Sequence, residues 1–177
     1  MLVEPVVAMR TWALGWRLRA RAPALLPVFE RGRPWPAREP ARGVCSRRRG
    51  HVAPEIGCLC GLHATNDEGR LRRTRTPAVL GTVAMWGRII EHQRGYRAEV
   101  AYPQRLRLTC FLCFIERGLE AERPALVARL ARGRLIPLCE RHLSLARRYS
   151  FPVAEVLSAA NVERALLDAY AVDPLAV

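Results

Sequence analysis

The chain has 177 residues, half of them hydrophobic, so it can bury a core and does not have the composition of a disordered protein. Its formal charge is +13, and every one of its 29 basic residues is arginine. No apolar run approaches the roughly 20 residues of a membrane-spanning helix, so we expect a cytoplasmic protein without a membrane partner. Nineteen of the arginines but only 8 of the 16 acidic residues lie in residues 1–105, which therefore carry most of the excess positive charge.

The first third of the chain predicts strands and loops. Residues 1–9 carry Glu4 and are too short for a secretory apolar region, so we expect a disordered or mis-assigned start, with Met9 as an alternative first residue. Residues 10–30 predict two strands, from partial apolar–polar alternation and a short apolar run. The two prolines in residues 32–36 exclude regular structure. Loops then follow over residues 45–60 and 66–77.

A β-hairpin is the clearest element in the sequence. Residues 79–93 are apolar and β-branched at their start, and residues 96–102 place Tyr96, Ala98, Val100 and Tyr102 on one face. Gly95 marks a turn near residues 93–95, and we expect Pro103 to end the second strand.

The remainder predicts helices. Residues 119–132 have Pro124 in a first turn and Gly133 as a stop signal. Residues 134–138 are extended, residues 139–149 form a second helix, and residues 153–170 form a last amphipathic helix that Ser150 can cap. The fold class is therefore α+β: a β-rich N-terminal domain over residues 10–105, a zinc-stapled helical C-terminal module over 106–150, and an amphipathic helix in 151–177.

Two pairs of metal-ligating residues form the most specific motif. We name them cluster 2: Cys110, Cys113, Cys139 and His142. Two close pairs separated by an insert is the spacing with which proteins enclose a tetrahedral zinc ion. The first pair can form a knuckle, and the second lies three residues apart, on one face of a helix. Four protein ligands leave no open position, so the zinc would be structural.

This arrangement resembles a treble-clef or related zinc finger over residues 106–150. The resemblance implies a knuckle, a β-hairpin and a helix whose first turn carries the second pair of ligands. The sequence departs from the pattern in the 25-residue insert, which predicts a helix where the family has a hairpin.

A second candidate site lies earlier in the chain, and we name it cluster 1: Cys45, His51, Cys58 and Cys60. His63 is an alternative to His51. Cysteines two residues apart rarely form a disulfide because the geometry is strained, and a reducing compartment disfavours one. Two Cys₃His sites would use all six cysteines, so we expect one or two zinc ions; a loop with buried thiols is the alternative.

Residues 10–105 also carry a set of short segments: HVAP (51–54), CLCG (58–61), GTVAMWG (81–87), EH (91–92), GYRAE (95–99) and YP (102–103). Together they resemble small actinobacterial proteins of no assigned function. The resemblance implies a bacterial source and no activity.

The functional hypothesis is a zinc-binding module for nucleic acid or a nucleotide-like ligand. Arginine clusters can meet phosphates, and aromatic side chains can stack on bases. The candidate contacts are Arg70, Arg72, Arg73, Arg75, Trp86, His92, Tyr96 and Arg97. Solvated arginine loops and aromatic side chains in the core are the alternatives, and another acidic partner would fit the same charge.

Two other classes of function stay open. The hairpin over residues 86–99 concentrates polar side chains that could form an enzyme site or bind a small ligand, but no phosphate loop or hydrolase motif is present, so an enzyme is less favoured. A structural or adaptor protein is the other class, since the apolar stripe of the last helix could pack on its own domain or form a homodimer.

Overall fold

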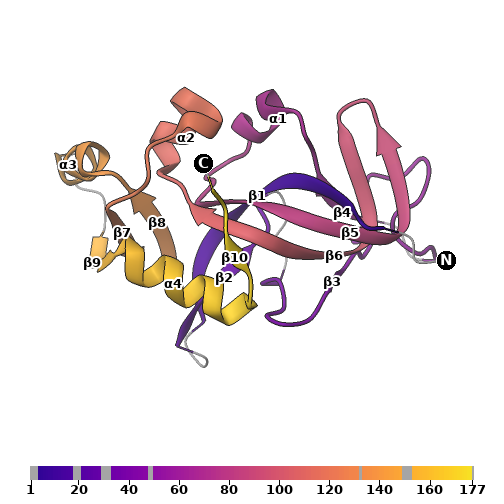
Figure 1. The fold of residues 1–177 in the computed structure, drawn as a ribbon, viewed down its shortest axis with the longest axis horizontal. Coiled ribbons are helices and arrows are strands. Elements are labelled where there is room, and N and C mark those ends of the chain that lie inside the picture. Colours follow the sequence, from indigo (N-terminus) through magenta and orange to yellow (C-terminus); the bar gives the residue numbers. More distant parts are fainter. Residues whose placement is uncertain are drawn as a thin grey trace.

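Strands form most of the regular structure in the computed structural model, which describes residues 4–17, 21–28, 33–47, 50–131, 133–148 and 153–176 (Figure 1). The elements in chain order are β1 (Val6–Arg17), β2 (Ala22–Leu26), β3 (Ala41–Arg42), β4 (Leu62–Ala64), α1 (Glu68–Arg72), β5 (Val79–His92), β6 (Gly95–Leu108), α2 (Phe111–Arg117), the 3₁₀ helix η1 (Gly118–Glu120), β7 (Leu126–Leu130), β8 (Arg134–Leu138), α3 (Glu140–Arg148), β9 (Val153–Ser158), α4 (Ala159–Tyr170) and β10 (Asp173–Pro174). The fold is mixed α+β and rich in strands, as the sequence predicts.

The strand β1 lies at the centre of the sheet, whose order is β10-β6-β5-β1-β8-β7-β9. Its first half pairs with β5, and its second half pairs with β2 and β8. The strand β4 pairs with β6, and the next residue, Thr65, exchanges two backbone hydrogen bonds of 3.0 and 2.8 Å with Met9 of β1. The path β1-β5-β6-β4 therefore returns to β1, and the sheet curls closed at this end.

The predicted hairpin is confirmed as β5 and β6, with a turn after His92. Pro103 does not end it, contrary to the sequence prediction, because β6 continues to Leu108. Pro103 lies at a register shift between Thr82 and Val83, where a bulge tolerates the missing backbone N–H. A second shift between Trp86 and Ile89 contains Gly87 with φ 76°, a conformation that glycine adopts at little cost. Both bulges bend the hairpin.

Two predicted helices are wrong over part of their length. The predicted helix 119–132 is η1 followed by β7, which pairs with β8 and β9; Val127 and Ala128 are buried on opposite faces of the sheet. The predicted helix 153–170 begins only at Ala159, because residues 153–158 form β9. Ser158 caps α4 by accepting a hydrogen bond from the backbone N–H of Asn161 at 3.4 Å. The predicted cap, Ser150, lies outside the described residues. The predicted helical C-terminal module is thus not confirmed.

The sheet has a hydrophobic core on each face. Adjacent strand residues alternate between them, so that Val79 and Leu80 point to different cores. The helix α4 packs its stripe, Val162, Leu166 and Tyr170, into the first core. The Tyr170 hydroxyl accepts a hydrogen bond from the backbone N–H of Leu25 at 3.0 Å and donates one to the carbonyl oxygen of Trp35 at 2.9 Å. The stripe is therefore packed inside the chain's own core.

The expected segment boundaries do not follow the elements. The boundary between residues 105 and 106 falls inside β6, and residues 6–9 of the expected disordered start belong to β1. Within the described part of the chain, no helix is long and apolar enough to cross a membrane.

Candidate metal centres

Both pairs of cluster 2 stand at the start of a helix. Cys110 directly precedes α2 and Cys113 lies in its first turn, where the backbone N–H of Phe114 donates to the Cys110 carbonyl at 2.9 Å. Cys139 links β8 to α3, whose first turn carries His142. The helical turns thus point the two ligands of each pair toward one centre. The first pair is part of a helix rather than the expected knuckle.

The four ligand atoms of cluster 2 have the dimensions of a tetrahedral metal site. The Nδ1 atom of His142 lies 3.3 Å from each of the three Sγ atoms, and the Sγ atoms of Cys113 and Cys139 are 3.7 Å apart. One imidazole nitrogen has a single hydrogen or lone pair, so hydrogen bonding cannot account for three such contacts. Zinc with bonds of about 2.3 Å to sulfur and 2.0 Å to nitrogen would give S···S edges of about 3.8 Å and S···N edges of about 3.5 Å.

Burial makes the ionised thiolates of cluster 2 unfavourable in free energy unless a cation is bound. All four residues are buried, and Cys110 is fully inaccessible. Burial raises the pKa of the Cys110 thiol and raises that of Cys113 to about 12. A bound cation would stabilise the thiolate forms and neutralise their charge in the core.

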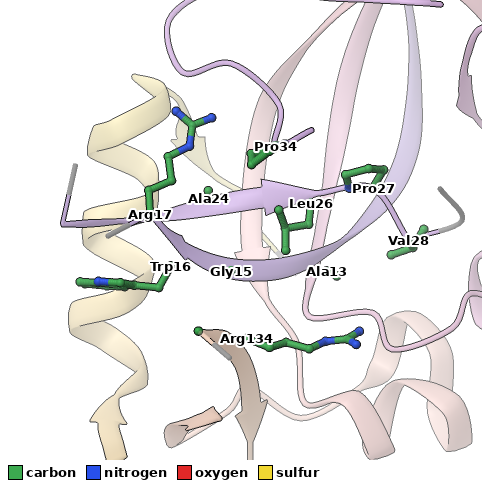
Figure 2. A pocket seen from close by; sticks show the side chains of 11 residues that line it. Ala13, Gly15, Trp16, Arg17, Ala24, Leu26, Pro27, Val28, Pro34 and Arg134 are labelled. Carbon is green, nitrogen blue, oxygen red and sulfur yellow. The ribbon is translucent and has the colours of Figure 1, made fainter. Parts of the chain in front are cut away.

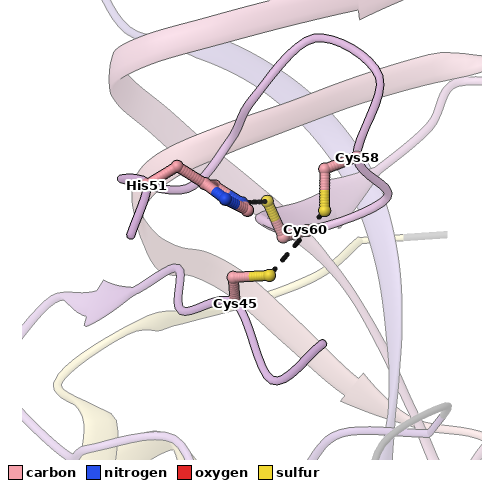
Figure 3. A group of neighbouring side chains, drawn as sticks. All are labelled: Cys45, His51, Cys58 and Cys60. Carbon is pink, nitrogen blue, oxygen red and sulfur yellow. Dashed lines mark hydrogen bonds between the residues drawn. The ribbon is translucent and has the colours of Figure 1, made fainter. Parts of the chain in front are cut away.

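Cluster 1 lies in the loop between β3 and β4 (Figure 3). The Sγ atoms of Cys45 and Cys58 are 3.7 Å apart, and the Nε2 atom of His51 lies 3.3 Å from the Sγ of Cys60. All four ligand atoms lie within 4.8 Å of one another. A disulfide needs about 2.05 Å between its sulfur atoms, and all six cysteines are free. The distances again match the edges of a tetrahedron.

The geometry selects His51 over His63. The Nε2 atom of His63 lies 2.9 Å from the carbonyl oxygen of Leu59, and its side chain faces solvent. The choice depends on how the loop folds back, because both histidines are close to the cysteines in sequence.

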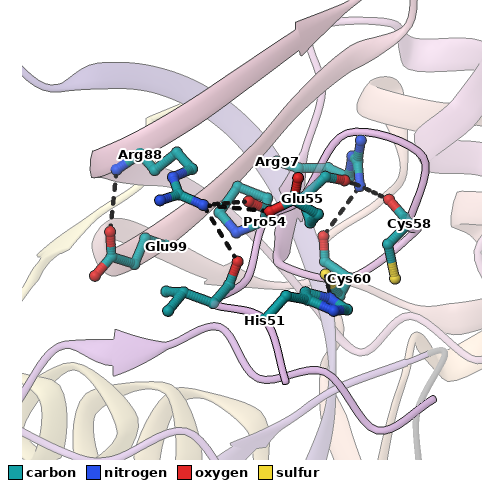
Figure 4. A network of polar contacts seen from close by, with 9 residues as sticks. His51, Pro54, Glu55, Cys58, Cys60, Arg88, Arg97 and Glu99 are labelled. Atoms are coloured by element: carbon teal, nitrogen blue, oxygen red, sulfur yellow. Dashed lines mark hydrogen bonds and ion pairs between the residues drawn. The ribbon is translucent and has the colours of Figure 1, made fainter. Parts of the chain in front are cut away.

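Two arginines of the hairpin hold the cluster 1 loop by its backbone (Figure 4). Arg97 is buried, and its guanidinium donates to the carbonyl oxygens of Glu55, Cys58 and Cys60. Arg88 donates to the carbonyl oxygens of Val52 and Pro54 at 3.4 Å each, and it forms an ion pair with Glu55 at 3.5 Å. Side chains of β5 and β6 therefore hold the loop from outside, and the contacts among the four ligand residues hold its parts together.

The thiols of cluster 1 differ from those of cluster 2. A hydrogen bond from the backbone of Cys60 lowers the pKa of Cys58 to about 7, whereas burial raises the pKa of Cys60. Cys58 is thus partly ionised at neutral pH, so a metal ion displaces fewer protons from it than from a thiol of ordinary pKa.

A groove of about 1500 Å³ lies beside cluster 1. Its walls come from β1, β4, α1, the tip of the hairpin and the loops around residues 35 and 44. The described lining residues include eight arginines and no aspartate or glutamate: Arg10, Arg33, Arg42, Arg47, Arg70, Arg73, Arg94 and Arg97. At its floor, the Arg10 guanidinium lies 4.7 Å from the ring centre of Trp35. The groove would therefore attract anions.

The predicted ligand-binding residues divide into two groups. Five of them line the groove: Arg70, Arg73, His92, Tyr96 and Arg97. Three lie outside its lining: Arg72 donates to the carbonyl oxygens of Ile115 and Glu116 at the end of α2, while Arg75 and Trp86 are exposed elsewhere. Sequence reasoning missed Arg10, Arg33, Arg42 and Arg94 as binding candidates, because none of them stands directly beside another arginine in the sequence.

The polar side chains of the hairpin bond mainly to one another and to the loop. The Nε2 atom of His92 accepts a hydrogen bond from Nε of Arg97 at 2.7 Å, and Glu99 accepts one from the backbone N–H of Arg88 at 3.2 Å. Glu99 also lies 4.0 Å from Arg42. These contacts favour a supporting role over an acid–base site.

A smaller pocket of about 360 Å³ lies between β1, β2 and β8 (Figure 2). Its two guanidinium groups are already bonded, that of Arg17 to the Trp35 carbonyl at 2.6 Å and that of Arg134 to the Thr76 hydroxyl. Its other described lining residues are apolar or glycine, so it offers neither a nucleophile nor a metal ligand.

Comparison with protein-family models, curated proteins and solved structures gives no match for this chain. Neither resemblance drawn from the sequence is therefore supported by a relative. The capacity of both clusters to hold a metal ion is inferred from their own geometry.

Proposed function

We propose that this protein is a zinc-stabilised binding module for nucleic acid. Three cysteines and one histidine in each cluster, at tetrahedral spacing, form a ligand set that suits zinc. Hard cations such as Mg²⁺ and Ca²⁺ prefer oxygen ligands, and neither cluster contains a carboxylate. The expected content is two structural zinc ions per chain.

The treble-clef resemblance gains support from the observed elements around cluster 2. The insert that predicted a helix contains the hairpin of β7 and β8, and α3, which begins directly after Cys139, then carries His142. A hairpin followed by a ligand-bearing helix is what the resemblance implies. We assign cluster 2 a structural role on this basis.

One observation carries the nucleic-acid assignment: eight arginines from distant segments converge on one groove, and no described carboxylate lines it. Arg70, Arg73 and Arg94 are exposed and form no ion pair with a described residue, so their guanidinium groups are available to phosphates. His92 and Tyr96 in the same groove can stack on bases.

The test compares two triple variants with the same loss of charge. In one, Arg70, Arg73 and Arg94 are replaced by Gln; in the control, the replaced residues are Arg75, Arg141 and Arg164, which are exposed and outside the groove. Binding of a labelled oligonucleotide is measured by fluorescence anisotropy across a salt series. Each lost phosphate contact should lower the slope of log affinity against log salt by about 0.7. The slope of log affinity against log salt should be smaller in magnitude by about two for the groove variant and unchanged for the control. Equal slopes for the two variants would contradict the assignment.

A further inference from the structure

Two apolar side chains in the wall of the groove face solvent. Val44 is 73% exposed and Leu59 is 66% exposed, and both line the groove. Each is a sequence neighbour of a cluster 1 ligand: Val44 precedes Cys45, and Leu59 stands between Cys58 and Cys60. Side chains alternate along an extended chain, so directing the two cysteine thiols into the cluster turns Leu59 the opposite way, toward the groove.

This wall has no regular structure of its own. The described residues 43–47 and 50–61 form neither strand nor helix. They are held by the contacts within cluster 1 and by hydrogen bonds from Arg88 and Arg97 to backbone carbonyls. Within the cluster, the described contacts are weak ones between cysteine thiols and between His51 and Cys60, and coordination bonds to a metal ion would replace them with much stronger ones. The positions of Val44 and Leu59 therefore depend on cluster 1.

The shape and lining of the groove favour one class of nucleic acid. Its volume of about 1500 Å³ exceeds the roughly 300–1,000 Å³ of small-ligand pockets, which disfavours a mononucleotide. A duplex encloses its bases, so it would bring phosphates to the arginines but leave Val44 and Leu59 without partners. A single strand presents phosphates and unstacked base faces together.

We propose, building on the proposed function, that the groove binds a single strand of nucleic acid, with phosphates at the arginines and bases against Val44 and Leu59, and that metal in cluster 1 holds this wall in place. Cluster 2 has a different role, since none of its four residues lines the groove. Loss of cluster 1 should thus remove binding while the core stays folded.

The experiment uses the full chain loaded with zinc and four probes: oligouridylate and oligothymidylate of about 12 nucleotides, a duplex of similar length, and uridine monophosphate. Both single strands should bind at least about tenfold more tightly than the duplex or the monophosphate. Comparing the affinities for oligouridylate and oligothymidylate shows whether the groove prefers RNA or DNA.

A matched pair of variants tests the apolar wall without touching a ligand. Leu59→Ala should weaken single-strand binding about tenfold, as expected for the loss of one buried leucine contact. Ile56→Ala removes a side chain that is 83% exposed on the same loop but does not line the groove, and it should leave binding unchanged.

A ligand variant tests the dependence on metal. Cys45→Ser should lose one zinc ion, abolish single-strand binding and keep the thermal transition of the core.

Three outcomes would overturn the inference: equal affinity for single strand and duplex, equal effects of the two alanine variants, or full binding by a Cys45→Ser protein that has lost its cluster 1 zinc. In each of these the proposed function would still stand. Failure of the wild-type protein to bind any oligonucleotide would instead remove the proposed function and the inference with it.

Discussion

The Arg97 guanidinium donates to the carbonyl oxygen of Cys60 at 3.2 Å, so a buried cation of β6 is bonded to a residue whose thiol belongs to cluster 1. The same guanidinium also bonds Cys58 and Glu55. Arg97 thus holds both cysteines of the C-x-C pair at once, from outside the metal site. Outer residues of this kind orient metal ligands in many sites.

Replacing Arg97 should therefore weaken metal binding at cluster 1. Arg97→Met keeps part of the apolar stem but leaves three backbone carbonyls without their donor, and we expect a loss of about 10–100-fold in zinc affinity at this site. Competition with a chromophoric chelator measures it. Arg88→Met, whose bonds to the loop are more exposed, is the control and should have a smaller effect. Equal affinities for Arg97→Met and wild type would show that the loop does not need this support.

The two clusters should respond differently to removal of one thiol. Cys113→Ser opens a buried site in the second core, and a structural zinc can contribute on the order of 10 kcal/mol to folding. We expect this variant to lose its cooperative melting, whereas Cys45→Ser, in a surface loop, should retain it. Elemental analysis should find two zinc ions in the wild type and one in Cys45→Ser. A Cys113→Ser protein that melts like the wild type would contradict the structural role of cluster 2.

Metal binding at cluster 2 should strengthen steeply as the pH rises. Zinc binds thiolates, and the pKa values of Cys110 and Cys113 are raised in the free site, so binding must release a proton from each of them. The log of the apparent affinity should thus rise by about two or more per pH unit between about pH 7 and pH 9. The Cys45→Ser variant isolates this site for the titration. A slope below about one would mean that the thiols are already ionised.

The hydroxyl of Tyr170 should matter for stability well beyond its helix. Tyr170→Phe leaves the Leu25 N–H without its acceptor and the Trp35 carbonyl without its donor in the core, which should cost about 1–3 kcal/mol. Urea denaturation measures the change in the free energy of unfolding. Tyr96→Phe is the control, since its hydroxyl bonds to no described residue, and it should change stability by less than about 0.5 kcal/mol. Equal midpoints for the two variants would contradict the role of the buried hydroxyl.

Cluster 2 could be predicted from the sequence because its ligands come in two local pairs. The two side chains of a closely spaced pair stay near each other whatever path the rest of the chain takes. Cluster 1 could be predicted as a group. The choice between His51 and His63 could not, because it depends on the path of the loop and on the bond from His63 to Leu59.

The strands β7 and β9 escaped prediction for a different reason. Leu126, Val127 and Leu130 fit an amphipathic helix as well as a strand, and only the pairing of β7 with β8 and β9 decides between them. The groove has no local signature at all. Its arginines are separated by up to 87 positions along the chain, between Arg10 and Arg97, and only the closure of the sheet brings them together.

The central place of β1 in the sheet affects how the protein can be made. The strand β1 can pair with β2 as soon as that strand is synthesised, but its other two neighbours, β5 and β8, follow about 70 and 120 residues later in the chain. Until then its buried face, including Trp12 and Leu14, has no complete core to enter. The core can be completed only when nearly the whole chain has been synthesised. A nascent or truncated product would expose the apolar side chains of β1, and this exposure would favour aggregation or binding by chaperones.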